Sequence, residues 1–187
     1  MNILILPENS ERDSYMLEPL FKALMMALGK PKAKVKTCPD PSFKGITTVL
    51  NVETLLDVFE EYDPYTQIYI LVVDRDGVED RAEGLYGFKQ KLGKPNLFAT
   101  CAIEEMETWI MAGCKLSPKM RWQDVRAQVK TSEGYFRQFA NDRGLTETVA
   151  QGRKTLGEEA SRNLPAIRQK CPEFNDLANK LEKHLAS

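Results

Sequence analysis

The sequence predicts an α/β protein with a mostly parallel sheet flanked by helices. Short apolar runs typical of buried strands alternate along the chain with segments whose apolar residues recur at helical spacing. One run, at 68–73, carries no charge, as expected for a strand buried on both faces of a parallel sheet. A chain of 187 residues, of which 42% are hydrophobic and 28% charged, is large enough for one substantial core and has the composition of a soluble globular protein.

The amino-terminal part alternates between strands and helices. The apolar run 2–6 ends at Pro7 and is typical of a first strand, and Ser10 is suited to cap the helix that follows. Apolar residues at helical spacing predict that helix over 11–28, and Gly-Lys-Pro at 29–31 ends it. By the same criteria we expect, in order, a strand at 32–37, a loop at 39–45, a helix at 52–62, the buried strand at 68–73, a charged segment at 79–92 that becomes helical, a strand at 96–103 and a helix from Glu104 through Met111.

The carboxyl-terminal part contains no convincing strand. We expect helices at 118–129, 134–141, 145–156, 160–170 and 172–185, separated by turns at Gly144, Gly157 and the Cys171-Pro172 junction. The sequence therefore predicts an α/β domain over 1–114 and a helical extension over 115–187 that packs on it.

Composition narrows the chemistry. The single histidine is His184, near the end of the chain, so Ser-His-Asp and Cys-His mechanisms lack the internal imidazole that they require. The four cysteines are too widely spaced for a zinc or redox motif, and we expect them to be reduced. No apolar run is long enough to cross a membrane and the amino terminus lacks the features of a signal peptide, so we expect a cytoplasmic protein. A net charge of -1 gives no overall attraction to nucleic acid.

Acidic residues follow three of the expected strands. Glu8 follows the first, Asp74 and Asp76 end the buried one, and Glu105 and Glu107 follow the last. The carboxyl ends of parallel strands lie on one edge of a sheet, so these groups should converge on one cleft. If strand geometry continues through Asp76, both aspartates point the same way, and two such charges need a cation between them.

Two explanations of these acids remain open. The first is a site for a hard divalent ion such as Mg²⁺ or Mn²⁺, which binds oxygen ligands. The second is structural: Asp-Arg-Asp-Gly at 74–77 is an ordinary turn sequence, and acids at the start of a helix interact favourably with its dipole. The dipole accounts well for Glu11 and Glu104 and in part for Glu105. It accounts less well for Asp74 and Asp76, because two close carboxylates gain little there without a counterion.

The pattern resembles the Toprim domain, a Rossmann-like α/β fold found in topoisomerases, primases and the overcoming-lysogenisation-defect nucleases. The stretches ILVVDRDG, AIEEMETWIMAG and GRKTLGEEASRNLPAIRQKCPEFNDL are similar to a family of small, uncharacterised bacterial Toprim-like proteins. The resemblance implies that Glu8, Asp74 and Asp76 bind metal, with Glu105 and Glu107 as further acids lining the site. Asn9 stands where many Toprim domains have glycine.

Basic residues near these motifs are candidates for phosphate contacts. Arg75 lies within the Asp-Arg-Asp-Gly sequence at 74–77, which we call the acidic turn, and Arg81 follows it. Arg153 precedes Lys154 in the segment that resembles the family tail. Lys154 would stabilise the charge of a phosphoryl transition state, although a lysine on a helix is more often only solvated. For Arg75 the alternative is a salt bridge to its neighbours, because strand alternation turns it away from the aspartates. We expect Trp109 to lie in the core.

The leading hypothesis for function is a Mg²⁺-dependent nuclease or related phosphodiester-processing protein, with nucleic acid as substrate. In it, Glu8 either binds metal or acts as a general base. The family resemblance adds an ATPase partner protein and a role in mobile-element or phage defence. The alternative is a non-catalytic Toprim-like module that interacts with a partner, which the near-neutral charge favours. A flavodoxin-like or receiver-type domain is a weaker third option, since no acidic pair follows the first strand and no glycine-rich phosphate loop is present.

Overall fold

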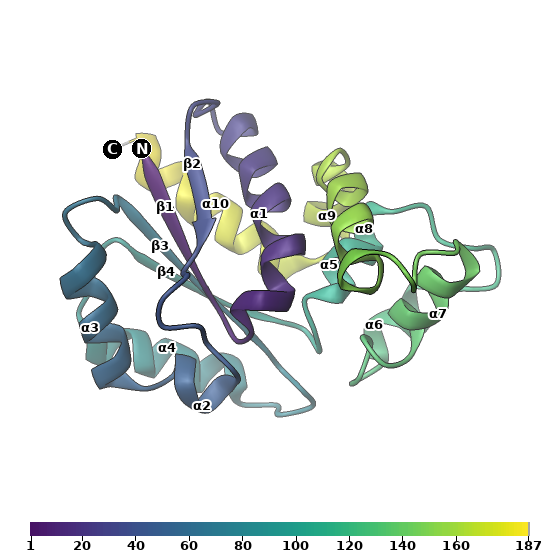
Figure 1. Ribbon diagram of the computed structural model, residues 1–187, viewed down its shortest axis with the longest axis horizontal. Helices are drawn as coiled ribbons and strands as arrows, with labels where there is room; N and C mark the ends of the chain where they lie inside the picture. The colour runs from purple at the N-terminus through teal and green to yellow at the C-terminus, as the bar shows by residue number, and fades with distance from the viewer. Residues whose placement is uncertain (187) are drawn as a thin grey trace.

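The fold is built around one sheet of four parallel strands. A computed structural model describes residues 1–186, and its strands lie in the order β2-β1-β3-β4 (Figure 1). Their bounds are β1 Asn2–Pro7, β2 Lys34–Thr37, β3 Ile68–Asp74 and β4 Leu97–Ala102. The predicted α/β class with a parallel, helix-flanked sheet is confirmed, and β1 and β3 occupy its centre.

Helices from both halves of the chain cover one face of the sheet. They are α1 Ser10–Ala27 and α10 Pro172–Ala186, which contact the strands directly. Three further helices, α5 Glu107–Gly113, α8 Arg153–Ser161 and α9 Leu164–Lys170, pack against them and against one another. Side chains of Ile5 and Ile70 on this face share a core with Leu20 and with Trp109, which is 0% exposed. The prediction that Trp109 is a core residue is confirmed, and the carboxyl-terminal helices share the core of the sheet.

The opposite face is covered by α2 Ile46–Val49, α3 Val52–Tyr62 and α4 Arg81–Leu92. Tyr69 and Leu71 of β3 pack here with Leu55, Phe59 and Leu85. Because side chains alternate along a strand, β3 buries hydrophobic residues on both faces, which explains its charge-free sequence. Burial of these two faces supplies most of the stability.

Two predictions of where a helix begins were wrong. Ser10 does not cap α1: the N-cap is Asn9, whose side chain accepts a hydrogen bond from the N–H of Arg12, while the Ser10 hydroxyl binds the N–H of Phe43. The helix expected over 145–156 is interrupted by the short 3₁₀ helix η1, Val149–Gly152, where Ala150 and Gln151 have φ of 52° and 55°. Such left-handed backbone cannot continue a right-handed helix, so α8 begins only at Arg153.

The remaining helices are α6 Trp122–Ala127 and α7 Tyr135–Asp142, which lie beyond the edge of the sheet (Figure 1). In residues 1–186 no helix combines the length and the hydropathy that crossing a membrane requires.

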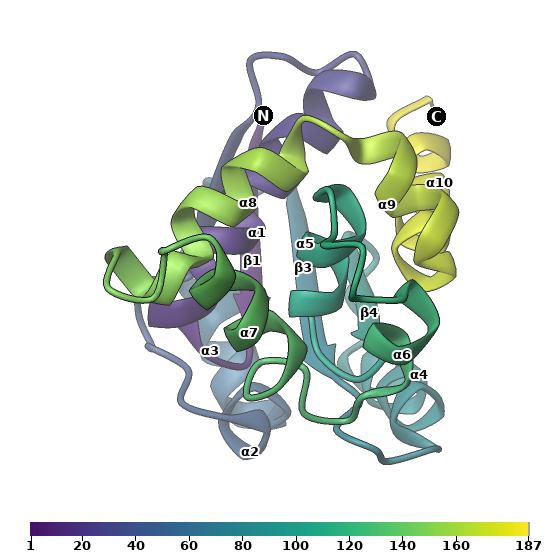
Figure 2. The ribbon, with the colours of Figure 1, turned by 90° about the vertical axis from the view of Figure 1, so that its right-hand side faces the viewer.

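Helix α8 lies against α1, as Figure 2 shows. Gly157 makes this close contact possible because it has no side chain. The sequence suggested a turn at this glycine, but it lies inside α8. A Cβ atom there would be 2.7 Å from the carbonyl oxygen of Tyr15 and 3.0 Å from the Cα atom of Met16. On the other side of α8, a Cβ on Gly113 of α5 would be 2.8 Å from the Cα atom of Ala160. These close approaches set the position of α8 and of Arg153 at its start.

We expect Gly157→Ala to lower the free energy of unfolding by about 1–3 kcal/mol, because the methyl group meets backbone atoms that can move only if the helices separate. Gly84→Ala in α4 is the matched control, since nothing lies within 4 Å of its added Cβ. That change should stabilise by up to about 1 kcal/mol through helix propensity alone. Urea unfolding of both variants checks the difference, and a similar effect of the two changes would contradict the close packing of α1 and α8.

Candidate functional site

Three segments meet at the carboxyl end of the sheet. Glu8 follows β1, and its Oε1 accepts a hydrogen bond from the backbone N–H of Asp74 at 2.8 Å. Asp74 is the last residue of β3, and its Oδ1 accepts the N–H of Met106 at 2.9 Å, just before α5. The predicted convergence of Glu8 and Asp74, which are remote in sequence, is therefore present in the structure, and it follows from the parallel pairing of β1 with β3.

Two further carboxylates complete the group. Asp13 in the first turn of α1 is 8% exposed and accepts the N–H of Asn9 at 2.9 Å, and Glu107 at the start of α5 is 5% exposed. We call Glu8, Asp13, Asp74 and Glu107 the carboxylate cluster. Burial, and then the charge of Glu107, raises the pKa of Asp13 to about 7. Burial, followed by the charges of the other three carboxylates, raises the pKa of Asp74 well above its ordinary value.

One buried cation faces the cluster. Arg153 is 3% exposed, and its Nη2 lies 2.6 Å and its Nε 3.2 Å from Oε1 of Glu107. Its guanidinium also lies over the ring of Phe136, 5.2 Å from the ring centroid, and its charge lowers the pKa of Asp13. Arg81 and Arg12 also act on the cluster, since their charges lower the pKa of Glu8 and of Asp13. The pKa values of Asp13 and Asp74 are nevertheless raised, first by burial and then by the charges of the neighbouring carboxylates.

Asp76 and Glu105 lie at the rim of the cluster. The strand ends at Asp74 and Asp76 has a φ of 51°, so the expected alternation through Asp76 does not occur and its side chain is exposed. Its charge nevertheless raises the pKa of Glu8 and of Glu105, in both cases after the larger effect of burial. Glu105 also accepts a hydrogen bond from the hydroxyl of Ser132 at 3.0 Å. The segment between α6 and α7 therefore closes over this side of the site.

Glu104 shapes the acidic turn. It is 2% exposed, has a φ of 58°, accepts the N–H of Gly77 at 2.9 Å and forms an ion pair with Arg75. Its carbonyl oxygen also accepts the N–H groups of Arg75 and Asp76. The alternative that the sequence allowed for Arg75, a salt bridge with a neighbouring acid, is the one that the structure contains.

The other basic candidates differ in position. The charge of Arg81, the first residue of α4, lowers the pKa of Glu8, and its Nε is buried without a hydrogen-bond partner in the described part of the chain. Arg153 forms a buried ion pair with Glu107. Lys154 is exposed and lines a surface hollow with Tyr15 and Glu18 of α1, so the structure does not bring it to the carboxylates.

Sequence reasoning missed Asp13, Ser132 and the internal role of Arg153. Asp13 lies in the first turn of a helix, where the helix dipole explains an acid without any site. Only the long-range packing of α8 against both α1 and α5 shows that Asp13 lies near Glu107. No local pattern marks Ser132.

The donor atoms of the cluster are carboxylate oxygens, which are the ligands that Mg²⁺ and Mn²⁺ prefer. In residues 1–186 no group of three or more Asp, Glu, His or Cys side chains is arranged to hold a metal ion. Side-chain rotations at the cluster would therefore have to accompany binding. In comparisons with known proteins, no family model, no curated protein and no solved structure matches the chain.

Proposed function

We propose that the carboxylate cluster binds a divalent cation, Mg²⁺ or Mn²⁺, and that the protein is a metal-dependent nuclease or related phosphodiester-processing enzyme. The observation that carries this proposal is the charge imbalance: four carboxylates from three segments share one guanidinium that is buried among residues 1–186, that of Arg153. Ionising Asp13 and Asp74 together at neutral pH requires a further cation, and a divalent ion supplies it in a small volume.

The residues divide into three roles in this proposal. Glu8, Asp13 and Asp74 would hold the ion, and Glu107 stays with Arg153. The bound ion would supply Lewis-acid polarisation of a phosphodiester and acidify a water molecule. Asp76 and Glu105 at the rim would accept the proton of that water or hold a second ion. Arg81 is the basic side chain best placed to bind a substrate phosphate, because it lies beside Glu8 with its Nε unpaired.

A second candidate is a non-catalytic module that uses the same cluster to bind metal or a basic surface of a partner. The observation that favours it is that the basic side chains near the cluster already form ion pairs within the protein or lie elsewhere. Arg75 pairs with Glu104, Arg153 pairs with Glu107, and Lys154 lies elsewhere. Few positive charges then remain for a phosphate backbone. The ATPase partner, the role in phage defence and the cytoplasmic location rest on the resemblance and the composition alone.

The decisive experiment is cleavage of labelled single-stranded and duplex DNA and RNA in the presence of Mn²⁺ or Mg²⁺. We expect Asp74→Asn and Glu8→Gln to reduce cleavage by at least about 100-fold, because each removes a ligand charge. Lys154→Ala is the matched control and should retain activity, since Lys154 lies away from the cluster. Cleavage that survives Asp74→Asn would contradict the proposed site. Metal binding without cleavage of any substrate would favour the non-catalytic module.

A further inference from the structure

Strand β4 leaves one edge of the sheet open. It is the last strand in the order β2-β1-β3-β4, and in residues 1–186 no strand pairs with its outer side. The carbonyl oxygens of Asn96 and Ala102 accept the N–H groups of Tyr69 and Arg75, each at 3.0 Å, and so point toward β3. Since peptide groups alternate in direction along a strand, the main-chain groups of Ala99 and Cys101 point outward, where they can pair with another extended chain.

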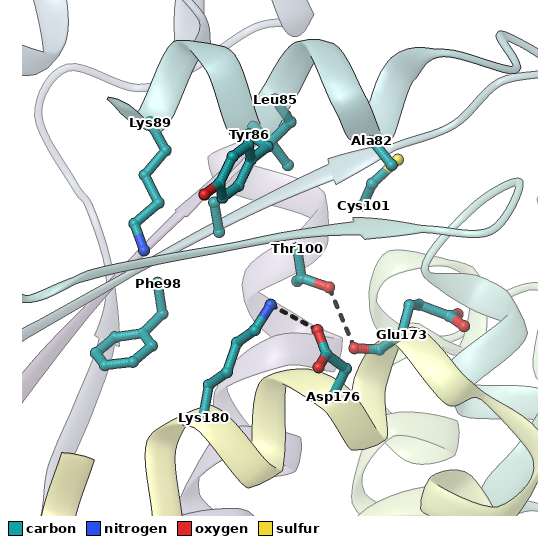
Figure 3. Close-up of a pocket in the computed structure, with 11 residues that line it drawn as sticks. Ala82, Leu85, Tyr86, Lys89, Phe98, Thr100, Cys101, Glu173, Asp176 and Lys180 are labelled. Atoms are coloured by element: carbon teal, nitrogen blue, oxygen red, sulfur yellow. Dashed lines mark hydrogen bonds and ion pairs between the residues drawn. The ribbon is translucent and has the colours of Figure 1, made fainter. Parts of the chain in front are cut away.

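The open edge forms the floor of a groove. A hollow of about 320 Å³ lies along β4 and is lined by Tyr86 and Lys89 of α4, by Phe98 of β4, and by Asp176 and Lys180 of α10. Figure 3 shows α4 on one side of the strand and α10 on the other. We call this hollow the β4 groove.

The two walls restrict what can enter. Paired strands lie about 4.8 Å apart, whereas packed helices need about 8–10 Å between their axes. Because α4 and α10 both pack on β4, a second sheet carrying its own helices would bring helix against helix before the strands could pair. A single extended segment has no such obstacle. The helices on both sides of β4 therefore favour a peptide over a second copy of the whole protein.

The charge of the groove favours an acidic peptide. The ammonium group of Lys89 is partly buried, lies 5.7 Å from the centroid of the Phe98 ring and forms no ion pair with any residue in 1–186. Burial and the positive charge of Lys180 both lower the pKa of Lys89, so the two ammonium groups lie near each other. Lys180 is paired with Asp176 at 2.6 Å, and Glu173, the other acid that lines the groove, is paired with Arg126. Of the charged side chains that line the groove, only Lys89 therefore forms no ion pair within residues 1–186. A carboxylate on an incoming strand would neutralise it.

We propose that the β4 groove binds an extended acidic segment of a partner protein, which adds as a further parallel or antiparallel strand to the sheet and places an Asp or Glu side chain against Lys89 and Lys180. Backbone hydrogen bonds to Ala99 and Cys101 supply affinity without sequence preference, and the lysines supply the preference for acid. This inference does not depend on metal binding, because none of the groove residues belongs to the carboxylate cluster.

The test measures, by fluorescence polarisation, how tightly the full chain binds a fluorescein-labelled peptide of sequence Thr-Val-Glu-Val-Thr-Val-Thr. Two further probes have Lys in place of Glu, or N-methyl groups on alternate residues that remove the pairing N–H groups. We expect micromolar binding of the acidic peptide, at least about 10-fold weaker binding of both other probes, and protection from hydrogen exchange at the Ala99 and Cys101 amides.

Charge reversal makes the test specific. Lys89→Glu should weaken the acidic peptide at least about 10-fold and strengthen the Lys peptide. Lys91→Glu on the same helix is the matched control, since Lys91 is exposed and does not line the groove. Unfolding in urea verifies that both variants are folded. Binding that is unchanged by Lys89→Glu or by N-methylation, or no binding of the acidic peptide, overturns the proposal. Self-association that Lys89→Glu abolishes would also overturn it, in favour of a second copy as the occupant.

Discussion

Arg153→Met should lower the free energy of unfolding of the metal-free protein by about 3–5 kcal/mol, which is the usual cost of removing one partner from a buried ion pair. Arg153 and Glu107 are 3% and 5% exposed, so water cannot replace the lost guanidinium. The loss leaves Glu107 near Asp13 and Asp74 with no buried cation among residues 1–186. Urea unfolding in the presence of a chelator measures the change.

Two controls separate charge from packing. The double variant Arg153→Met with Glu107→Gln should recover more than half of the lost stability, because removing both charges of a buried pair is often nearly neutral. Arg121→Met breaks an ion pair with Asp124 on the surface and should leave the free energy of unfolding almost unchanged. A loss for Arg153→Met no larger than that for Arg121→Met would show that the cluster does not depend on its buried cation.

The stability of the metal-free protein should fall as the pH rises from about 4 to about 7. The pKa of Asp13 is about 7 in the folded protein, against an ordinary value of 3.8. The folded state therefore keeps a proton that the unfolded chain has already released, so the stabilisation is present at low pH and disappears as the pH rises through 7. The raised pKa of Asp74 acts in the same direction. The combined loss should reach a few kcal/mol, at about 1.4 kcal/mol per unit of pKa shift.

Asp13→Asn tests the origin of this slope. The amide keeps an oxygen for the N–H of Asn9 but does not titrate. The variant should therefore be more stable than wild type at about pH 8 and show a shallower dependence on pH. A slope as steep as that of the wild type would assign the effect to other groups.

The parallel sheet and the meeting of Glu8 with Asp74 could be predicted because each depends on a local signal. A charge-free strand such as β3 must be buried on both faces, and acids at the ends of parallel strands share an edge whatever connects them. The direction in which the Asp76 side chain points could not be predicted. It depends on Glu104, which binds the acidic turn through contacts with Arg75 and Gly77.

The adjacent residues Arg153 and Lys154 show where sequence reasoning fails. Neighbours on a helix point about 100° apart, so one of them reaches the cluster while the other reaches solvent. Which residue does so depends on how α8 lies against α1, and the contact at Gly157 determines that arrangement. A glycine inside a helix reads as a turn when the helix it packs against is unknown. Asp13 could not be recognised as a site residue for a related reason: Glu107, whose charge raises its pKa, lies on a separate helix.

The carboxylate cluster contains more acidic groups than Arg153 can neutralise, and we expect it to bind a divalent ion. The most direct measurement is urea unfolding at about pH 8, with a chelator or with about 1 mM Mn²⁺, for wild type and Asp74→Asn. We expect Mn²⁺ to stabilise the wild type by at least about 2 kcal/mol, and to leave Asp74→Asn unchanged even though that variant is at least as stable as wild type in chelator. Equal stabilisation of the two proteins by Mn²⁺, or no stabilisation of either, would contradict the claim.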